Sequence, residues 1–253
     1  MTARQIDMEA DDFLAELSRN VPKRAMVVMA HPDDCEFVCG GTVAKLCSEG
    51  WDMQIIVTTS GNKGTKDPRV TAQQLAGERE QEQRRAAEIL GAREPVFFGF
   101  PDGYIVNDEE LRGLIVREIR RFRPELVITW DGFRPGFNHR DHRRTGRATY
   151  DAIYPAADDH LYYPRDKEED LEPHRPIAML LAGTNEPDCT VDIERVLQTK
   201  VRAVLAHVSQ MGNRNEEDML RIWRERARQR ADQEGDGRDP VFSESFRKVL
   251  MRR

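Results

Sequence analysis

The stretch AMVVMAHPDDCE (residues 25–36) predicts both the fold and the position of a site. The apolar run 25–29 has the composition of a buried strand, and the proline and two aspartates that follow are typical of a turn into a helix. His31 and Asp34 are three residues apart in that turn, so a nitrogen and a carboxylate oxygen can converge on an ion such as zinc. Asp33 is then free for chemistry. The alternative is a plain turn in which an aspartate caps the next helix.

A second histidine motif, HRDH (139–142), lies far downstream and follows another strand-like run by one short loop. His139 and His142 are at positions i and i+3, which places both on one side of the first turn of a helix. Two segments with metal-binding chemistry, each after a predicted strand, favour one metal site over two unrelated turns. Together they supply three ligands and two spare groups for catalysis.

Apolar, β-branched runs alternate along the chain with stretches of helical period, which is typical of βαβ units and a mostly parallel sheet. Strands are predicted at 25–30, 53–59, 95–98, 126–130 and 177–182. Helices are predicted at about 7–18, 42–49 with Thr42 as a possible cap, 71–90, 108–123, from 139 onward, 193–208 and 216–233. We predict an α/β, Rossmann-like three-layer fold with strand order 3-2-1-4-5. Strands 1 and 4 then meet where the winding reverses, which brings HPDD and HRDH to one crevice.

The composition predicts a soluble protein of one domain, 1–253, with a charged helical extension at about 213–253. The net charge of −6 disfavours nucleic acid and acidic membranes as partners. No apolar run reaches the ~18 residues of a membrane span. The acidic, amphipathic N-terminus has no secretion signal, and the four cysteines form no CxxC pair, so we expect a cytoplasmic protein.

Two groups of residues near the motifs have competing interpretations. Cys35 and Cys39 flank the proposed site at i and i+4; a thiolate ligand is conceivable, but helix packing explains this spacing better. Five arginines surround the second motif, and they either attract an anionic substrate or form a solvated helix face, which is the favoured reading: Arg134, Arg140, Arg143, Arg144 and Arg147.

The motifs resemble those of the LmbE-like, or PIG-L, zinc-dependent N-deacetylases, which include enzymes acting on N-acetylglucosaminyl conjugates. The matching segments cover most of the chain in family order: 30–46, TTSGNKGT (58–65), LAGEREQEQRRAAEILG (75–91), GFPDG (99–103), NHRDHRRTG (138–146), EPHRP (172–176) and KVRAVLAHVSQ (200–210). The resemblance implies the LmbE-like fold and a hydrolase that removes an acetyl group from an N-acetylglucosamine-type conjugate. Zinc is the implied cofactor, although a site of two histidines and one aspartate also accepts ions such as Fe²⁺.

The resemblance also implies roles for individual residues. Asp33 is implied as the general base, His139 as the charged or acidic partner, and Asp141 as the group that orients a histidine. Arg79 and Asp102 match positions associated with the substrate sugar; for Arg79 the alternative is an exposed salt bridge. Three residues are implied as the zinc ligands: His31, Asp34 and His142.

The chain departs from the family pattern at two places. Cys35 replaces a glutamate often found after HPDD, with Glu36 one position later. Phe137 stands where some members carry a tyrosine that helps the oxyanion, which leaves His139 and zinc as the main stabilisers. Three other histidines are not assigned to the chemistry: His207 is interpreted as structural, the role of His174 is left undecided, and His160 has no expected role.

Two alternatives to acetyl removal remain at this point. One is an amidase that cleaves a larger acyl group, such as that of a thiol conjugate or a secondary metabolite. The other is a metal-binding module without catalysis, although a purely structural zinc site is normally closed by a fourth protein ligand. The expected partners are a small N-acylated amino sugar and, because family members often form homo-oligomers, further copies of the chain.

Overall fold

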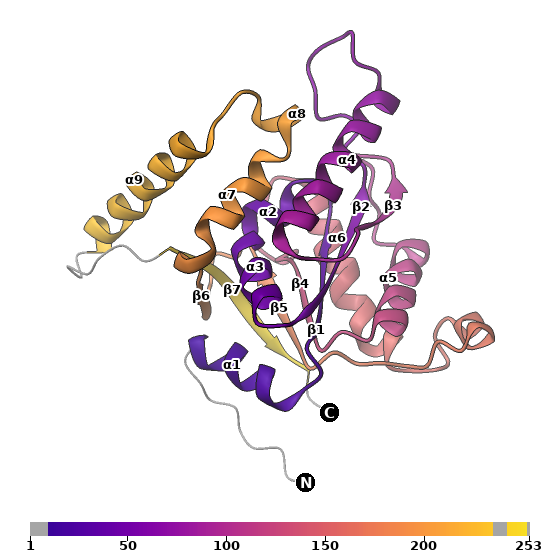
Figure 1. Ribbon diagram of the computed structural model, residues 1–253. Helices are drawn as coiled ribbons and strands as arrows, with labels where there is room; N and C mark the ends of the chain where they lie inside the picture. The colour runs from indigo at the N-terminus through magenta and orange to yellow at the C-terminus, as the bar shows by residue number, and fades with distance from the viewer. Residues whose placement is uncertain (1–9, 235–241, 252–253) are drawn as a thin grey trace.

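The computed structural model describes residues 10–234 and 242–251, and within these ranges seven strands form one sheet with helices on both faces (Figure 1). The strand order is β3-β2-β1-β4-β5-β7-β6. The first five strands in this order pair in parallel: β3 (Val96–Phe100), β2 (Asp52–Thr59), β1 (Arg24–Met29), β4 (Leu126–Trp130) and β5 (Ala178–Ala182). The predicted α/β class and the order 3-2-1-4-5 are confirmed.

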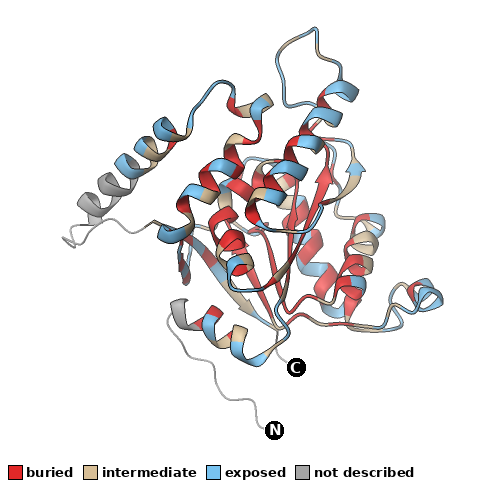
Figure 2. Cartoon of the chain, viewed as in Figure 1, coloured by how far each residue is buried: buried red, intermediate tan, exposed pale blue. Residues whose placement is uncertain are grey.

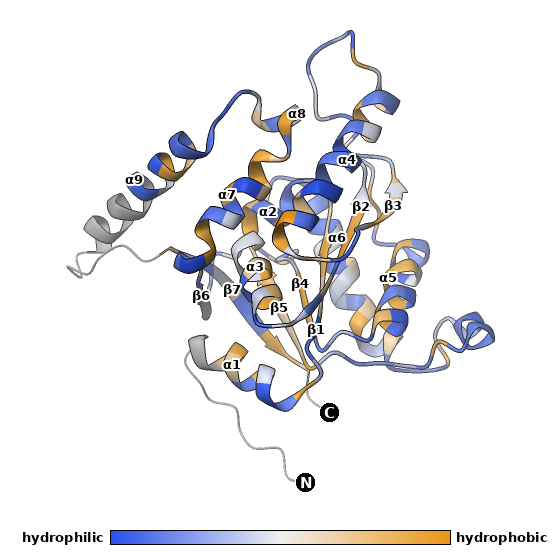
Figure 3. Cartoon of the chain, in the orientation of Figure 1, coloured by the Kyte–Doolittle hydropathy of each residue, from blue (hydrophilic) through white to orange (hydrophobic). Residues whose placement is uncertain are grey.

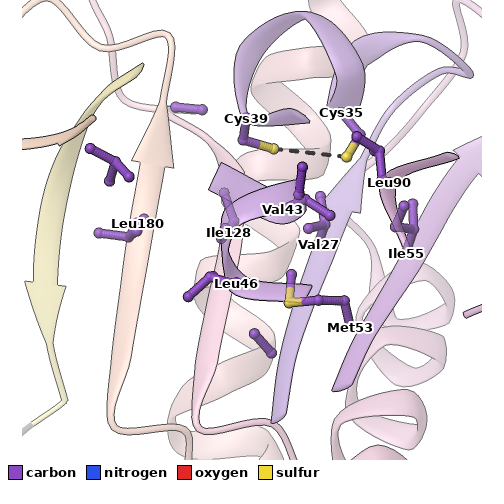
Figure 4. Close-up of a cluster of buried hydrophobic side chains, with 14 of the residues drawn as sticks. Val27, Cys35, Cys39, Val43, Leu46, Met53, Ile55, Leu90, Ile128 and Leu180 are labelled. Atoms are coloured by element: carbon purple, nitrogen blue, oxygen red, sulfur yellow. Dashed lines mark hydrogen bonds between the residues drawn. The ribbon is translucent and has the colours of Figure 1, made fainter. Parts of the chain in front are cut away.

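The central strands are buried on both faces, as expected for a parallel sheet covered by helices (Figure 2). Because successive side chains point to opposite faces, Val27 and Met29 belong to one core, while Met26 and Val28 belong to the other. The first core lies under three helices, α3 (Gly40–Ser48), α4 (Ala72–Leu90) and α7 (Leu197–Leu205), and part of it is drawn in Figure 4. The second lies under α5 (Glu109–Phe122) and α6 (Arg140–Asp151). Figure 3 shows the apolar strands between more polar helices.

Two predicted helices have the expected ends. Thr71 caps α4 in a reciprocal capping box with Gln74, and Gly91 ends the helix with a φ of 82°. Asp108 caps α5 by accepting from the Leu111 backbone N–H at 3.0 Å. These ends were predicted correctly because cap and stop residues act locally.

Other helix boundaries differ from the prediction. A short helix, α2 (Asp34–Val38), begins inside the HPDD motif, and α3 begins at Gly40, so Thr42 lies within a helix and is not its cap. The predicted helix 193–208 is divided into a 3₁₀ turn (Glu194–Val196), α7 and α8 (Val208–Met211). Beyond α6 the chain continues through a π-helical turn (Ala152–Ala157) and a 3₁₀ turn (Pro164–Glu169). Helix α1 is Ala10–Asn20; the predicted start at 7 lies outside the described residues.

The sequence predicted a helical extension at about 213–253, but the described part of this segment is not helical throughout. After α9 (Glu216–Glu234) the chain forms β7 (Ser243–Leu250), which pairs antiparallel with β5 and with β6 (Cys189–Asp192). The segment SESFRKVL starts with an alternating pattern: Glu244 and Phe246 are buried between exposed neighbours. That period of two belongs to a strand, and the highly charged sequence before it concealed the change. Among the described helices, none combines the length and apolarity needed to cross a membrane.

Candidate active site

The two histidine motifs meet at the carboxyl ends of β1 and β4. These strands are paired in parallel, so their carboxyl ends lie at the same edge of the sheet. The turn after β1 carries His31, and His139 immediately precedes the first residue of α6, which follows β4. His31 Nδ1 lies 3.2 Å from His142 Nε2 although the residues are 111 apart in the sequence. The predicted convergence of HPDD and HRDH is therefore confirmed.

The three residues predicted as metal ligands lie close together, and the two separations made by His142 Nε2, to His31 Nδ1 at 3.2 Å and to Asp34 Oδ1 at 3.1 Å, suit one divalent ion. His31 Nδ1 lies 3.5 Å from Asp34 Oδ2. Ligand atoms ~2.0–2.1 Å from a tetrahedral zinc ion are about 3.3 Å from one another. Two imidazoles and one carboxylate are also a donor set that zinc accepts. The cluster is therefore a candidate metal centre on both distance and chemistry.

Asp34 is held by groups that leave one of its oxygens for a ligand. Its Oδ2 atom accepts from the backbone N–H groups of Ala30 at 3.1 Å and His31 at 2.9 Å, and from the indole of Trp130 at 3.0 Å. Burial alone would raise the pKa of Asp34, but the imidazoles of His142 and His31 hold it well below its ordinary value. The carboxylate is thus kept in its anionic, metal-binding form.

His142 lies between two aromatic rings. Its ring stacks on Trp130 at 4.2 Å with an interplanar angle of 10° and on His139 at 4.2 Å with an angle of 18°. A nitrogen of His139 lies within 4.8 Å of nitrogens of His31 and His142. Trp130 was not predicted as part of the site; its place as the last residue of the strand before HRDH was the signal available in the sequence.

The second nitrogen of His31 faces two carboxylates. His31 Nε2 lies 3.1 Å from Asp102 Oδ1 and 3.5 Å from Asp141 Oδ2. Burial lowers the pKa of His31, but Asp102, Asp141 and Asp34 together raise it to about 11. Carboxylates in this position orient a metal-binding imidazole and increase its basicity.

Asp102 and Asp141 share a contact with His31 that the sequence did not show, and the predicted sugar contact of Asp102 stays a prediction. Asp102 was expected at the substrate sugar, and the structure places it against His31, with the Lys63 backbone N–H donating to it at 3.2 Å. Asp141 was expected to orient a histidine, and the histidine that its Oδ2 atom lies near is His31. Burial, followed by the nearby His142 and His31, lowers the pKa of His139, so the expected cationic state is not favoured.

Asp33 lies next to the metal-binding set in an unusual backbone conformation. Its φ is 94°, in the left-handed region that few residues other than glycine adopt. Burial and the adjacent Asp34 raise the pKa of Asp33 to about 7, although Arg79 opposes this. A carboxylate whose pKa lies near the working pH is suited to act as a general base.

Arg79 is buried beneath Asp33, with 4% of its surface exposed. Its guanidinium donates to Asp33 Oδ2 at 3.1 Å, to Gly61 O at 2.9 Å and to Pro32 O. A Cβ at Gly61 or Gly64 would lie 2.3 or 2.5 Å from Arg79 Nη1, so only glycine allows this loop to wrap around the arginine. Arg79 is therefore not an exposed salt bridge, and the groups it contacts are protein groups.

Three of the five arginines near HRDH hold the loop between β4 and α6. Arg134 donates to Gly183 O at 2.6 Å, Arg143 to the carbonyls of Phe137 and Asn138, and Arg147 to Gly132 O at 2.8 Å. Arg140 and Arg144 are exposed, as is Arg147, which agrees in part with the solvated helix face that the sequence favoured. Most of the cluster thus has a structural function that neither interpretation of the sequence included.

Cys35 and Cys39 point into the core, where their sulfur atoms are 3.9 Å apart (Figure 4). The Cys39 hydrogen bond and burial raise the pKa of Cys35, and burial raises that of Cys39. Both therefore remain neutral thiols, which agrees with the packing interpretation.

A separate surface pocket of about 250 Å³ is lined by Arg120, His160 and Lys167 among others. Arg120 already donates there to Asp166 and to several backbone carbonyls. The pocket does not contain the reactive set found at the end of β1.

Comparison with known proteins shows the family of the chain. A family model described as GlcNAc-PI de-N-acetylase (PIG-L) matches residues 26–153. The chain is 34% identical to a diacetylchitobiose deacetylase of Thermococcus kodakarensis, over 84% of this chain and 78% of that protein. It is 26% identical to a 1D-myo-inositol 2-acetamido-2-deoxy-alpha-D-glucopyranoside deacetylase of Actinosynnema mirum, over 77% of this chain and 83% of that protein. The fold is similar to that of N,N'-diacetylchitobiose deacetylase from Pyrococcus horikoshii, with a TM-score of 0.80, 24% identity, and coverage of 97% and 95%.

Proposed function

Because this chain belongs to the GlcNAc-PI de-N-acetylase (PIG-L) family, we propose that it is a zinc-dependent hydrolase that removes the N-acetyl group from an N-acetylglucosamine-type compound. The observation that carries the proposal is the position of Asp33, a half-buried carboxylate with 16% of its side chain exposed and a pKa raised to about 7, beside three proposed ligands that lie close together. Relatives that act on N-acetylated sugars support the substrate class.

His31, Asp34 and His142 would hold the ion. When bound, a zinc ion lowers the pKa of a coordinated water toward ~7 and polarises a carbonyl. Asp102 and Asp141 keep His31 oriented, and Trp130 keeps both Asp34 and His142 in place. The chain thus presents a prearranged set of ligands.

Asp33 would act as the general base that accepts a proton from the attacking water, and would return it to the leaving amine. Arg79 holds the Asp33 carboxylate at 3.1 Å. His139 lies at the start of α6 against His142, and it would donate to the oxygen of the amide as charge develops. Phe137 is buried against Trp130 and has no hydroxyl to assist.

The proposal is tested by the release of primary amine from zinc-loaded protein. The panel contains N-acetylglucosamine, N,N'-diacetylchitobiose and a glucosaminyl-inositol acetamide, each with a matched analogue carrying a longer acyl group. Release from the acetyl compounds that is absent in Asp33→Asn, with zinc still bound, supports deacetylation by this site. Release from the longer acyl compounds alone indicates the amidase alternative.

A non-catalytic metal site remains the second candidate because of His139, whose ring nitrogen lies close enough to the others to act as a fourth ligand. Stoichiometric zinc with no amine release from any compound would favour this candidate over the hydrolase. In that case His139→Ala should weaken zinc binding, whereas in the hydrolase it should reduce turnover and leave zinc bound.

We also propose that the protein works in the cytoplasm and forms a homo-oligomer. The apolar residues Leu220 and Trp223 of α9 pack on the core of the chain itself, so they are not free to form an oligomer contact. Another surface would have to form the interface. Sedimentation of the purified protein at several concentrations tests the assembly.

A further inference from the structure

A buried glutamine on α4 contacts the backbone of Asp33. The amide of Gln83 is fully buried, and its Oε1 atom accepts from the Asp33 backbone N–H at 3.0 Å. Asp33 is one of four non-glycine residues with a positive φ in the described part of the chain. Since that conformation is unfavourable for a residue with a Cβ, the surroundings must stabilise it. The hydrogen bond to Gln83 is one such restraint.

The direction of the Gln83 amide is set by Glu36. Gln83 Nε2 donates to Glu36 Oε1 at 2.8 Å, and an ionised carboxylate only accepts hydrogen bonds. The NH₂ group must therefore face Glu36, which leaves the oxygen of the amide for the Asp33 N–H. If Glu36 were an amide, Gln83 could adopt either orientation. In one of them the Gln83 NH₂ group would face the Asp33 backbone N–H, so that two donors would oppose each other.

His207 completes this arrangement from a different part of the chain. Its Nε2 atom lies 3.2 Å from Glu36 Oε2, and both side chains have no exposed surface. The contact is an ion-pair distance and not an aligned hydrogen bond, because His207 Nδ1, His207 Nε2 and Glu36 Oε2 all have no hydrogen-bond partner among the described residues. A carboxylate buried this completely requires a polar or charged partner, and His207 is the group at hand.

The segment that carries His207 is itself tied to the elements around Asp33. Ser209 donates through its backbone N–H and its hydroxyl to Glu82 at 2.6 and 2.7 Å, and Glu82 is the neighbour of Gln83 on α4. Gln210 Nε2 donates to Gly64 O at 3.2 Å, in the loop that wraps around Arg79. The segment 207–210 thus contacts both the helix and the loop that support Asp33.

We propose that His207, Glu36 and Gln83 form a buried relay of contacts that holds Asp33 in its left-handed conformation with its carboxylate aimed at the metal centre. The inference rests on the proposed function, because it assumes that Asp33 is the base. The three members are positioning residues: they are buried behind the site, and they act on the reaction only through Asp33. His207, which lies between α7 and α8, is thereby given a specific purpose beyond packing.

The test compares Gln83→Met with Gln81→Met. Methionine has nearly the length of glutamine without the amide, and Gln81 lies on the exposed side of the same helix. With zinc-loaded protein we expect kcat to fall at least tenfold in Gln83→Met, with KM within twofold of the wild type and one zinc per chain. Gln81→Met should match the wild type in all three. An unchanged kcat in Gln83→Met, or a loss explained entirely by lost zinc, overturns the relay.

A second variant keeps the test valid if Gln83→Met does not fold. Glu36→Gln replaces only the carboxylate by an amide of the same size. It should lower kcat in the same way because the Gln83 amide is no longer oriented. In the double variant Glu36→Gln, Gln83→Met the two losses should not add, since both remove the same restraint. Additive losses would overturn the proposal.

A structural readout separates this inference from the proposed function. If the wild type releases no amine from any substrate, the function fails, but the relay is still tested by a crystal structure of Gln83→Met. We expect Asp33 to leave the positive φ region or its carboxylate to turn away from Arg79. An unchanged Asp33 in that structure overturns the relay.

Discussion

The guanidinium of Arg79 donates to Asp33 Oδ2 at 3.1 Å while it also holds the carbonyls of Pro32 and Gly61. One side chain from α4 therefore binds the proposed base, the residue before it and the loop after β2. All three contacts are largely shielded from water, where hydrogen bonds to a charged group are strong. These contacts show that Arg79 supports Asp33, and the sugar contact implied by the family resemblance stays a prediction.

Arg79→Lys should lower kcat at least a hundredfold with little change in KM. A lysine keeps the charge but lacks the planar fork that serves three acceptors at once. Steady-state kinetics on the best acetylated substrate checks this prediction, with Arg85→Lys, an exposed arginine on the same helix, as the control. If KM rises while kcat is kept, Arg79 binds the sugar after all.

Asp33→Asn should stabilise the protein in chelator at pH 8 and have little effect at pH 4. The pKa of Asp33 is raised in the folded protein to about 7 from its ordinary 3.8, so the folded state holds a proton that the unfolded state loses. Wild-type stability therefore falls as the pH rises from about 4 to about 7, and a difference of this size corresponds to about 4 kcal/mol. Asparagine cannot ionise and avoids the loss.

Urea unfolding of both proteins across this pH range measures the effect. The free energies of unfolding of the two proteins should be similar at about pH 4, and above that pH the value for the wild type should fall increasingly below that for Asp33→Asn. Parallel curves would mean that Asp33 ionises as easily in the folded chain as in the unfolded one.

His142→Ala should lose the metal. The variant removes one of three ligands and also the ring stacked between Trp130 and His139. We expect less than a tenth of the wild-type zinc after dialysis, measured by atomic absorption. His160→Ala changes an exposed histidine that faces no proposed ligand and should keep full zinc content. Normal zinc in His142→Ala would remove this residue from the ligand set.

Glu244→Ala should destabilise the protein by about 3 kcal/mol, which is the lower end of the range for removing one member of a buried ion pair. Glu244 on β7 accepts from Lys200 Nζ at 2.6 Å and from the backbone N–H groups of Gly41 at 2.8 Å and Thr42 at 2.7 Å. All three donors lose this acceptor in the variant. Denaturant unfolding gives the free energy.

The control for this prediction is Glu186→Ala. Glu186 forms a 3.9 Å pair with Arg247 on the same strand, but its side chain is 82% exposed. An exposed pair contributes about 0–1 kcal/mol, so this variant should stay near the wild type. Equal losses in the two variants would show that the burial of Glu244 has no special effect.

The five central strands and the meeting of the two histidine motifs were predictable because both depend on local patterns. Buried parallel strands are continuous apolar runs, and helix ends such as Thr71 and Gly91 carry their own signals. The C-terminal strand was missed, since its alternation of buried Glu244 and Phe246 with exposed residues is short and follows a highly charged helix. The strands that β7 pairs with, β5 and β6, are distant in the sequence, so the segment itself does not indicate this pairing.

The sequence by itself determined the α/β class, the order of the central strands and the convergence of His31, Asp34 and His142, because residue type, spacing and parallel winding are sufficient for these. The tertiary structure alone decided what each remaining polar group contacts. Arg79 supports Asp33, Asp102 and Asp141 share His31, and Glu36 meets Gln83 and His207 from α4 and the segment after α7. Hydrogen bonds act over about 3 Å and depend on direction, so they are decided only when distant segments pack together.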